Sequence, residues 1–148
     1  MRYNNIILGH VLEHVIDPVA ILELCKKWIS DNGRILASVP NKKSIHRQAG
    51  VEMGLLSRPD DFSEKDKRHG HRRIFGPDSF AECFNKVGLK IIKSGGYWLK
   101  PFSDSQIEAW YSDKMIDTFL KLGEHYPDIA GEIYIVANYY LQDQGNTI

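Results

Sequence analysis

The chain has 148 residues, 43% of them hydrophobic and 11% aromatic, and its 19 basic residues balance its 19 acidic ones. This length and composition exclude a disordered segment, and the zero net charge gives no global attraction to DNA or RNA, so we expect no nucleic-acid partner. No apolar run approaches the length of a membrane span and no secretory signal precedes the first strand, so we expect a cytoplasmic protein without a membrane partner.

The first third of the chain predicts a strand, a helix and a second strand. Ile6–Leu8 is short and apolar, as in a buried parallel strand. Asp17 and Pro18 suit a helix cap and a first helical position, and Asn32–Gly33 is expected to end that helix. The apolar run Arg34–Val39 follows as a strand. This order predicts a right-handed βαβ unit.

Residues 42–73 are polar and charged, without sustained periodicity. We predict a lid-like insert with one short helix near His46–Leu55, because loops of this length in a compact domain are often lids or binding segments.

The remaining chain predicts a helix from Pro77 to Gly88, and then a strand over Leu89–Lys93 that Gly95–Gly96 breaks. Residues 103–131 are expected to form a helical insert, with one helix from about Asp104 to Leu122. The run "GEIYIVANYY" closes the pattern as an aromatic strand. The fold class is therefore α/β, in a single domain over residues 1–148.

Two long stretches carry a resemblance to a known family. "NNIILGHVLEHVIDPVAILELCKKWISDNGRILASVPN" and "HGHRRIFGPDSFAECFNKVGLKII" resemble the second half of a class I S-adenosylmethionine-dependent methyltransferase, of the type 11/12 or UbiG-like group. The resemblance implies a partial Rossmann-like sheet, with strands equivalent to the fourth to seventh and helices on both faces. It also implies methyl transfer from S-adenosylmethionine to a small-molecule acceptor.

The glycine-rich cofactor turn of that family is absent from this sequence. We therefore expect the C-terminal half of a methyltransferase, a truncated domain that is inactive alone. The alternative is a non-catalytic fragment or pseudoenzyme that acts as a binding or dimerisation module. In the whole fold the fourth strand is central, so its outer edge would be unpaired here, and we expect a homo-oligomer through the first strand.

The turn after the first strand contains the first candidate site residues. The resemblance places Leu8, Gly9 and His10 beside the methionine part of the cofactor, with His14 able to add a hydrogen bond.

A metal site is a second interpretation of the same turn. His10, Glu13 and His14 have the i, i+3, i+4 spacing that puts ligands on one face of a helical turn, and imidazole plus carboxylate suits zinc, iron or manganese. The stretch resembles the Glu-x-x-Glu-His element of metal-dependent small-RNA and ubiquinone-pathway O-methyltransferases, with His10 in place of the first glutamate. A purely structural loop remains open.

The run "KRHGHRR" supplies the remaining candidates. His69 and His71 are candidate general bases, because the histidine pKa lies near working pH. Arg72 and Arg73 are candidates for gripping an anionic substrate, and Trp98 for walling its pocket. A solvated charged loop and packing of Trp98 on the sheet are the alternatives.

Overall fold

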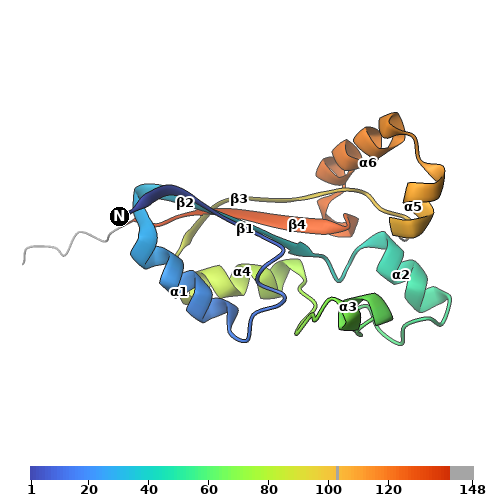
Figure 1. The fold of residues 1–148 in the computed structure, drawn as a ribbon, viewed down its shortest axis with the longest axis horizontal. Helices are drawn as coiled ribbons and strands as arrows, with labels where there is room; N and C mark the ends of the chain where they lie inside the picture. Colours follow the sequence, from blue (N-terminus) through green and yellow to red (C-terminus); the bar gives the residue numbers. More distant parts are fainter. Residues whose placement is uncertain (103, 141–148) are drawn as a thin grey trace, which may run out of the picture.

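The structure is a computed structural model that describes residues 1–102 and 104–140, and its centre is a mixed four-stranded sheet (Figure 1). Strand β1 (Tyr3–Gly9) runs parallel to β2 (Ile29–Pro40). Strand β4 (Glu132–Asn138) runs antiparallel to both β2 and β3 (Lys90–Tyr97). The spatial order is therefore β1-β2-β4-β3, which confirms the α/β prediction.

Helices α1 (Pro18–Trp28) and α4 (Pro77–Lys86) lie together against one face of the sheet (Figure 1). The predicted start of α1 is confirmed, because the Asp17 carboxylate accepts hydrogen bonds from the first two free N–H groups of the helix. The hydrophobic core fills the space between these helices and the sheet. Its fully buried large residues include Leu12, Leu22, Ile29, Ile35, Phe80 and Phe84.

The predicted end of α1 at Asn32–Gly33 is wrong. The helix ends at Trp28, and the completely buried Ile29 already belongs to β2. Tyr3 pairs with Ile29 but Asn5 pairs with Arg34, so β2 holds extra residues in a bulge that contains this dipeptide. Asn32 is left-handed there, with φ 61°.

The prediction that Gly95–Gly96 breaks a strand is also wrong, since both residues lie inside β3. A Cβ at Gly95 would lie 2.8 Å from the Tyr134 hydroxyl, and one at Gly96 would lie 2.7 Å from the Ala130 side chain. The two glycines therefore make room for neighbouring side chains, and they do not end the strand.

The insert 42–73 contains the expected helix, α2 (Ile45–Glu52), and an unexpected short one, α3 (Glu64–Arg68). The single helix expected after Asp104 is two helices, α5 (Asp104–Trp110) and α6 (Asp113–His125), followed by the short η1 (Pro127–Ile129). The break between α5 and α6 has a local cause: the Ser112 hydroxyl accepts a hydrogen bond from Met115 N–H and caps α6.

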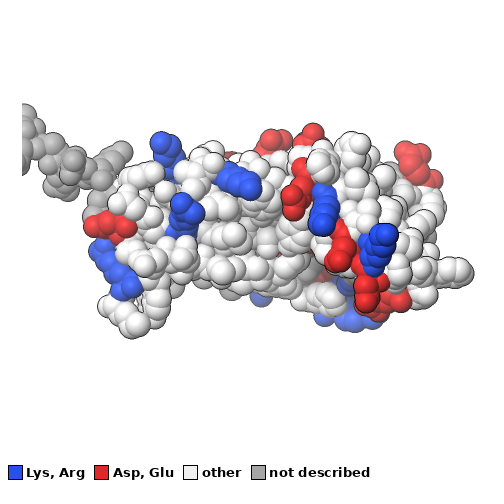
Figure 2. Space-filling model, turned by 90° about the horizontal axis from the view of Figure 1, so that it is seen from above, with Lys and Arg blue, Asp and Glu red and all other residues white. Residues whose placement is uncertain are grey.

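Among the described elements, α6 covers the face opposite α1 and α4 at one end, where it packs on the end of β3 (Figure 1). Ile7 on this face is 71% exposed, and its β2 neighbour Leu36 is 36% exposed. Seen from this side, much of the surface over the strands is uncharged, with isolated basic side chains (Figure 2). Among the described residues, no strand pairs with the outer edge of β1.

The strand directions bring the possible site residues to one edge of the sheet. The carboxyl ends of β1, β2 and β3 and the start of β4 meet there, close to the two inserts (Figure 1). Side chains from segments far apart in the sequence therefore lie together at this edge.

Candidate functional site

The loop that follows β1 begins with a backbone turn at His10. This residue has φ 52°, a left-handed value, and its N–H donates to the Ser38 carbonyl on β2. Two residues later the chain turns inward, so that Leu12 is completely buried in the core and Glu13 is 1% exposed. The loop therefore carries a carboxylate into the interior of the protein.

Arginines of the insert hold this loop in place. The Arg72 N–H donates to the Glu13 carbonyl at 2.8 Å. The Arg73 guanidinium donates to the carbonyl oxygens of Leu12, Val15 and Ile16 at 2.8, 2.5 and 2.8 Å. Arg73 thus stabilises the loop. The role of Arg73 and of the exposed Arg72 side chain in binding an anionic substrate stays a prediction.

The Glu13 carboxylate is the buried centre of the site. Neither of its oxygens has a hydrogen-bond partner of good geometry. The nearest groups are ring nitrogens: His10 Nδ1 lies 3.3 Å from Oε1 and His14 Nε2 lies 3.8 Å from it. Ligand atoms of Glu13, His14 and His71 all lie within 4.8 Å of one another. A buried carboxylate surrounded by imidazoles is suited to binding a cation.

Both ring nitrogens of His10 face acidic or phenolic groups. Its Nε2 lies 3.7 Å from the Glu132 carboxylate and 3.5 Å from the Tyr97 hydroxyl. The Glu13 carboxylate, more than Glu132, raises the pKa of His10, although burial opposes the shift. Burial raises the pKa of Glu132. The ligand atoms of Glu13, His14 and His71 thus converge, and the predicted ligand set of His10, Glu13 and His14 stays a prediction.

His71 enters the site from the insert. Its ring packs edge-on against that of His14, with 4.8 Å between the ring centroids. Burial lowers the pKa of His71, and its Nδ1 lies 3.1 Å from the Asp66 carboxylate. His69 is exposed, with its ring centroid 6.2 Å from that of His71. Only one of the two candidate bases thus reaches the cluster.

Trp98 and Lys100 follow β3 at the same edge of the sheet. Trp98 is left-handed, with φ 61°, and its N–H and carbonyl bond to Leu120 and Gly131. Burial lowers the pKa of Lys100, and Glu132 opposes this shift. The sequence analysis did not identify Lys100, Glu132 and Asp66, because no sequence pattern predicts the burial of charged residues at strand ends or in loops. It did identify Trp98, whose place on the substrate side stays a prediction.

Comparison with known proteins decides the family. The methyltransferase domain family matches residues 1–94, more than half of the chain. The chain belongs to the S-adenosylmethionine-dependent methyltransferases.

A curated relative, the ubiquinone biosynthesis O-methyltransferase of Dinoroseobacter shibae, is 28% identical over 105 residues. The match covers 69% of this chain and 40% of that protein. The methyltransferase chain thus spans well under two thirds of this relative's length.

Solved structures share the fold at low sequence identity. A methyltransferase from Mesorhizobium loti superposes with a TM-score of 0.59 at 12% identity, over 93% of this chain and 62% of that one. A methyltransferase from Archaeoglobus fulgidus gives 0.51 at 16% identity, over 93% and 60%. The mixed sheet of this chain therefore corresponds to part of a methyltransferase fold.

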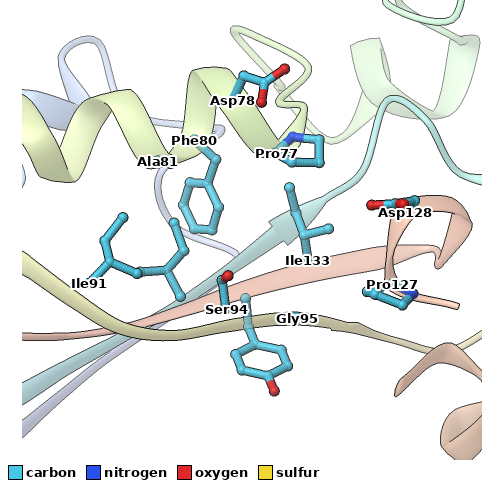
Figure 3. Close-up of a pocket in the computed structure, with 12 residues that line it drawn as sticks. Pro77, Asp78, Phe80, Ala81, Ile91, Ser94, Gly95, Pro127, Asp128 and Ile133 are labelled. Atoms are coloured by element: carbon cyan, nitrogen blue, oxygen red, sulfur yellow. The ribbon is translucent and has the colours of Figure 1, made fainter. Parts of the chain in front are cut away.

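Two cavities of the described residues lie away from the histidine cluster. One of about 300 Å³ lies between α4 and the edge of the sheet (Figure 3). Its walls are mainly apolar, with Phe80, Ile91 and Ile133 pointing into it. The candidate site of this methyltransferase is therefore defined by its converging polar side chains and not by cavity size. Within residues 1–102 and 104–140, none of the helices has the length and apolarity needed to cross a bilayer.

His46 on α2 makes the stability of this edge depend on pH. Burial, with the nearby cations Lys100 and Arg47, lowers the pKa of His46 to about 3. An unfolded chain binds a proton at this histidine below pH 6.5, whereas the folded chain does not. The contribution of His46 to stability is therefore present above pH 6.5 and is lost as the pH falls toward 3.

We expect wild type to lose up to about 1.4 kcal/mol per pH unit relative to the His46→Gln variant between pH 6 and 4. Urea unfolding at a series of pH values measures this difference. His125→Gln, which replaces an exposed histidine at the end of α6, is the matched control. Parallel stability profiles of wild type and His46→Gln would contradict the assignment.

Proposed function

We propose that this chain carries the acceptor side of a methyltransferase that methylates a hydroxyl oxygen of a small molecule, beside a divalent cation held by Glu13, His14 and His71. The observation that carries the proposal is the Glu13 carboxylate, which is buried without a hydrogen bond of good geometry and lies among the imidazoles of His10, His14 and His71. A buried charge that lacks hydrogen bonds is costly, and a bound cation would reduce that cost.

The strand order supports the acceptor-side assignment. If β1 to β4 stand for the fourth to seventh strands of the family, the order β1-β2-β4-β3 becomes fourth, fifth, seventh, sixth. All four strands belong to one sheet. Ligands of such folds bind at the carboxyl ends of the strands. Leu8, Gly9, His10 and His14 lie at the carboxyl end of β1, where we place the methionine part of S-adenosylmethionine.

The donor set fits a cation such as zinc, iron or manganese, because it combines two imidazoles with one carboxylate. Metal–ligand bonds of about 2.1 Å bring ligand atoms to within about 4.2 Å of one another. The observed limit of 4.8 Å therefore needs only small side-chain movements. When bound, the cation would lower the pKa of an acceptor hydroxyl beside it.

In-line methyl transfer breaks the S–CH₃ bond of the cofactor, forms an O–CH₃ bond, and releases the hydroxyl proton to a base. Positioning supplies most of this catalysis. With His71 holding the cation, the exposed His69 is the remaining predicted proton acceptor. Arg72 and Trp98 are proposed to orient the acceptor. The Dinoroseobacter shibae relative is an O-methyltransferase, which supports oxygen as the methylated atom.

The cation part of the proposal predicts the behaviour of Glu13→Gln. We expect this variant to weaken zinc binding by about 100-fold, or about 2.7 kcal/mol, because the amide keeps the shape of the side chain but loses the negative charge. Titration with zinc chloride in the presence of a competing chelator measures the affinity.

Glu132→Gln is the matched control, because Glu132 is a partly buried carboxylate on the other side of His10. Its zinc affinity should stay within a few-fold of wild type. Equal losses in both variants would contradict the ligand set.

The cofactor part predicts the result of calorimetric titration with S-adenosylhomocysteine. The proposed cofactor residues come from a single strand end, and the sequence contains no glycine-rich turn. We therefore expect the chain alone to bind with a Kd above about 1 mM, equivalent to a binding free energy weaker than about −4.1 kcal/mol. Saturable binding at micromolar concentration would show that this chain holds a complete cofactor site.

A second candidate function is that of a non-catalytic binding or dimerisation module. The observation that favours it is the unpaired outer edge of β1, next to the exposed side chains of Ile7 and Leu36. Such an edge offers backbone N–H and C=O groups to a further strand. We infer that a second copy of this chain pairs there, giving a homo-oligomer through β1.

Self-association through β1 should be sensitive to a charge on that strand. We expect Ile7→Lys to shift the sedimentation velocity profile from dimer to monomer, since a lysine on an edge strand opposes pairing. Ile16→Lys is the matched control, because Ile16 is 79% exposed but lies in the loop after β1. A monomeric wild-type chain at 100 μM would contradict the inference.

A further inference from the structure

His71 has a second carboxylate beside it, that of Asp66. Its Nδ1 lies 3.1 Å from Asp66 Oδ1, at ion-pair distance but without the geometry of a hydrogen bond, and both side chains are only 9% exposed. The His71 N–H also donates to the Asp66 carbonyl, so the two residues are joined through backbone and side chain. Asp66 itself does not belong to the cluster formed by Glu13, His14 and His71.

A neutral imidazole has one N–H donor and one nitrogen lone pair. A carboxylate beside Nδ1 keeps the proton on that nitrogen, and the lone pair of Nε2 is then free to bind a cation. Arg47 and Ser63 both donate to Asp66 Oδ2, and its other oxygen, Oδ1, faces His71.

We propose that Asp66 is a positioning residue, which fixes His71 as the Nδ1–H tautomer and directs Nε2 to Glu13 and His14. The inference rests on the proposed cation site and assigns it a supporting group from the insert. Asp66 touches neither substrate nor cation, and it acts through His71 alone.

Asp66 is held in turn by the buried Arg47. The Arg47 Nη1 donates to Asp66 Oδ2 at 2.9 Å, and its Nε donates to the Pro59 carbonyl at 2.7 Å. A third hydrogen bond joins Arg47 Nη2 to the Asp61 carbonyl. The Ser63 N–H and hydroxyl also donate to Asp66 Oδ2, at 2.8 and 2.7 Å. The position of His71 thus depends on the folding of the whole segment 42–73.

This arrangement couples cation binding to the stability of the insert, so that each favours the other. A ligand that binds only when His71 is in place stabilises the fold of the segment that holds it. Zinc binding should therefore slow amide hydrogen exchange in residues 57–71, which surround Arg47 and Asp66.

Asp66→Asn tests the inference through zinc affinity. We expect a 10- to 100-fold weaker affinity, the range typical when a supporting group beside a metal ligand is lost. Asp61→Asn is the matched control, because the Asp61 carboxylate accepts from the N–H groups of Ser57 and Arg58 in the same segment. Its affinity should stay within a few-fold of wild type. Equal affinities of Asp66→Asn and wild type would overturn the inference.

The tautomer of His71 can also be measured directly on the wild-type chain without metal, so this test does not depend on whether a variant folds. Long-range ¹H–¹⁵N correlation of the His71 ring at pH 7.5 should show the Nδ1–H tautomer. An Nε2–H tautomer or an imidazolium would overturn the inference. If the Nδ1–H tautomer is found but wild type binds no zinc, the positioning by Asp66 is supported and the proposed cation function fails.

Discussion

A carboxylate that is removed from water must find a compensating charge or hydrogen bond, and the arrangement around Glu13 follows from this constraint. Leu12 is buried in the core, and the next residue of the loop after β1, Glu13, is buried with it. Arg73 then fixes the loop by binding three of its carbonyl oxygens. The remaining freedom lies in the imidazoles, and three of them gather around the buried charge.

The insert 42–73 is held in place by its own charged residues, and its lid-like role stays a prediction. Its buried Arg47–Asp66 ion pair joins α2 to α3, and Arg72 and Arg73 attach its end to the loop after β1. Charged residues that look solvated in the sequence are used internally, where each guanidinium satisfies several carbonyl oxygens at once. A short helix such as α3 is possible because its cap and its ion pair share one aspartate.

Local chemistry in the sequence predicted the elements whose signals are local. Asp17 and Pro18 determine the start of α1 through capping alone, and the Glu13–His14 pair in its turn was identified from spacing. The same reasoning failed at Asn32–Gly33 and Gly95–Gly96, because a glycine required by a distant side chain looks the same as one required by a turn. The contribution of His71 to the cluster depends on a contact 57 or more residues away in the chain, between the insert and the loop after β1. No periodicity in a single sequence encodes such a contact.

The strand order has a consequence for how the chain acquires its fold. Strand β4 is the last of the described strands in chain order, yet it lies between β2 and β3 and pairs with both. During synthesis, the edge of β2 that pairs with β4 stays without a partner until residues 132–138 emerge. Nearly 100 residues separate β2 from β4. Contacts between residues so far apart in the sequence slow folding, and they leave hydrophobic strand edges exposed until β4 has been synthesised. A chaperone that binds nascent extended segments would therefore meet β2 and β3 before it met a finished sheet.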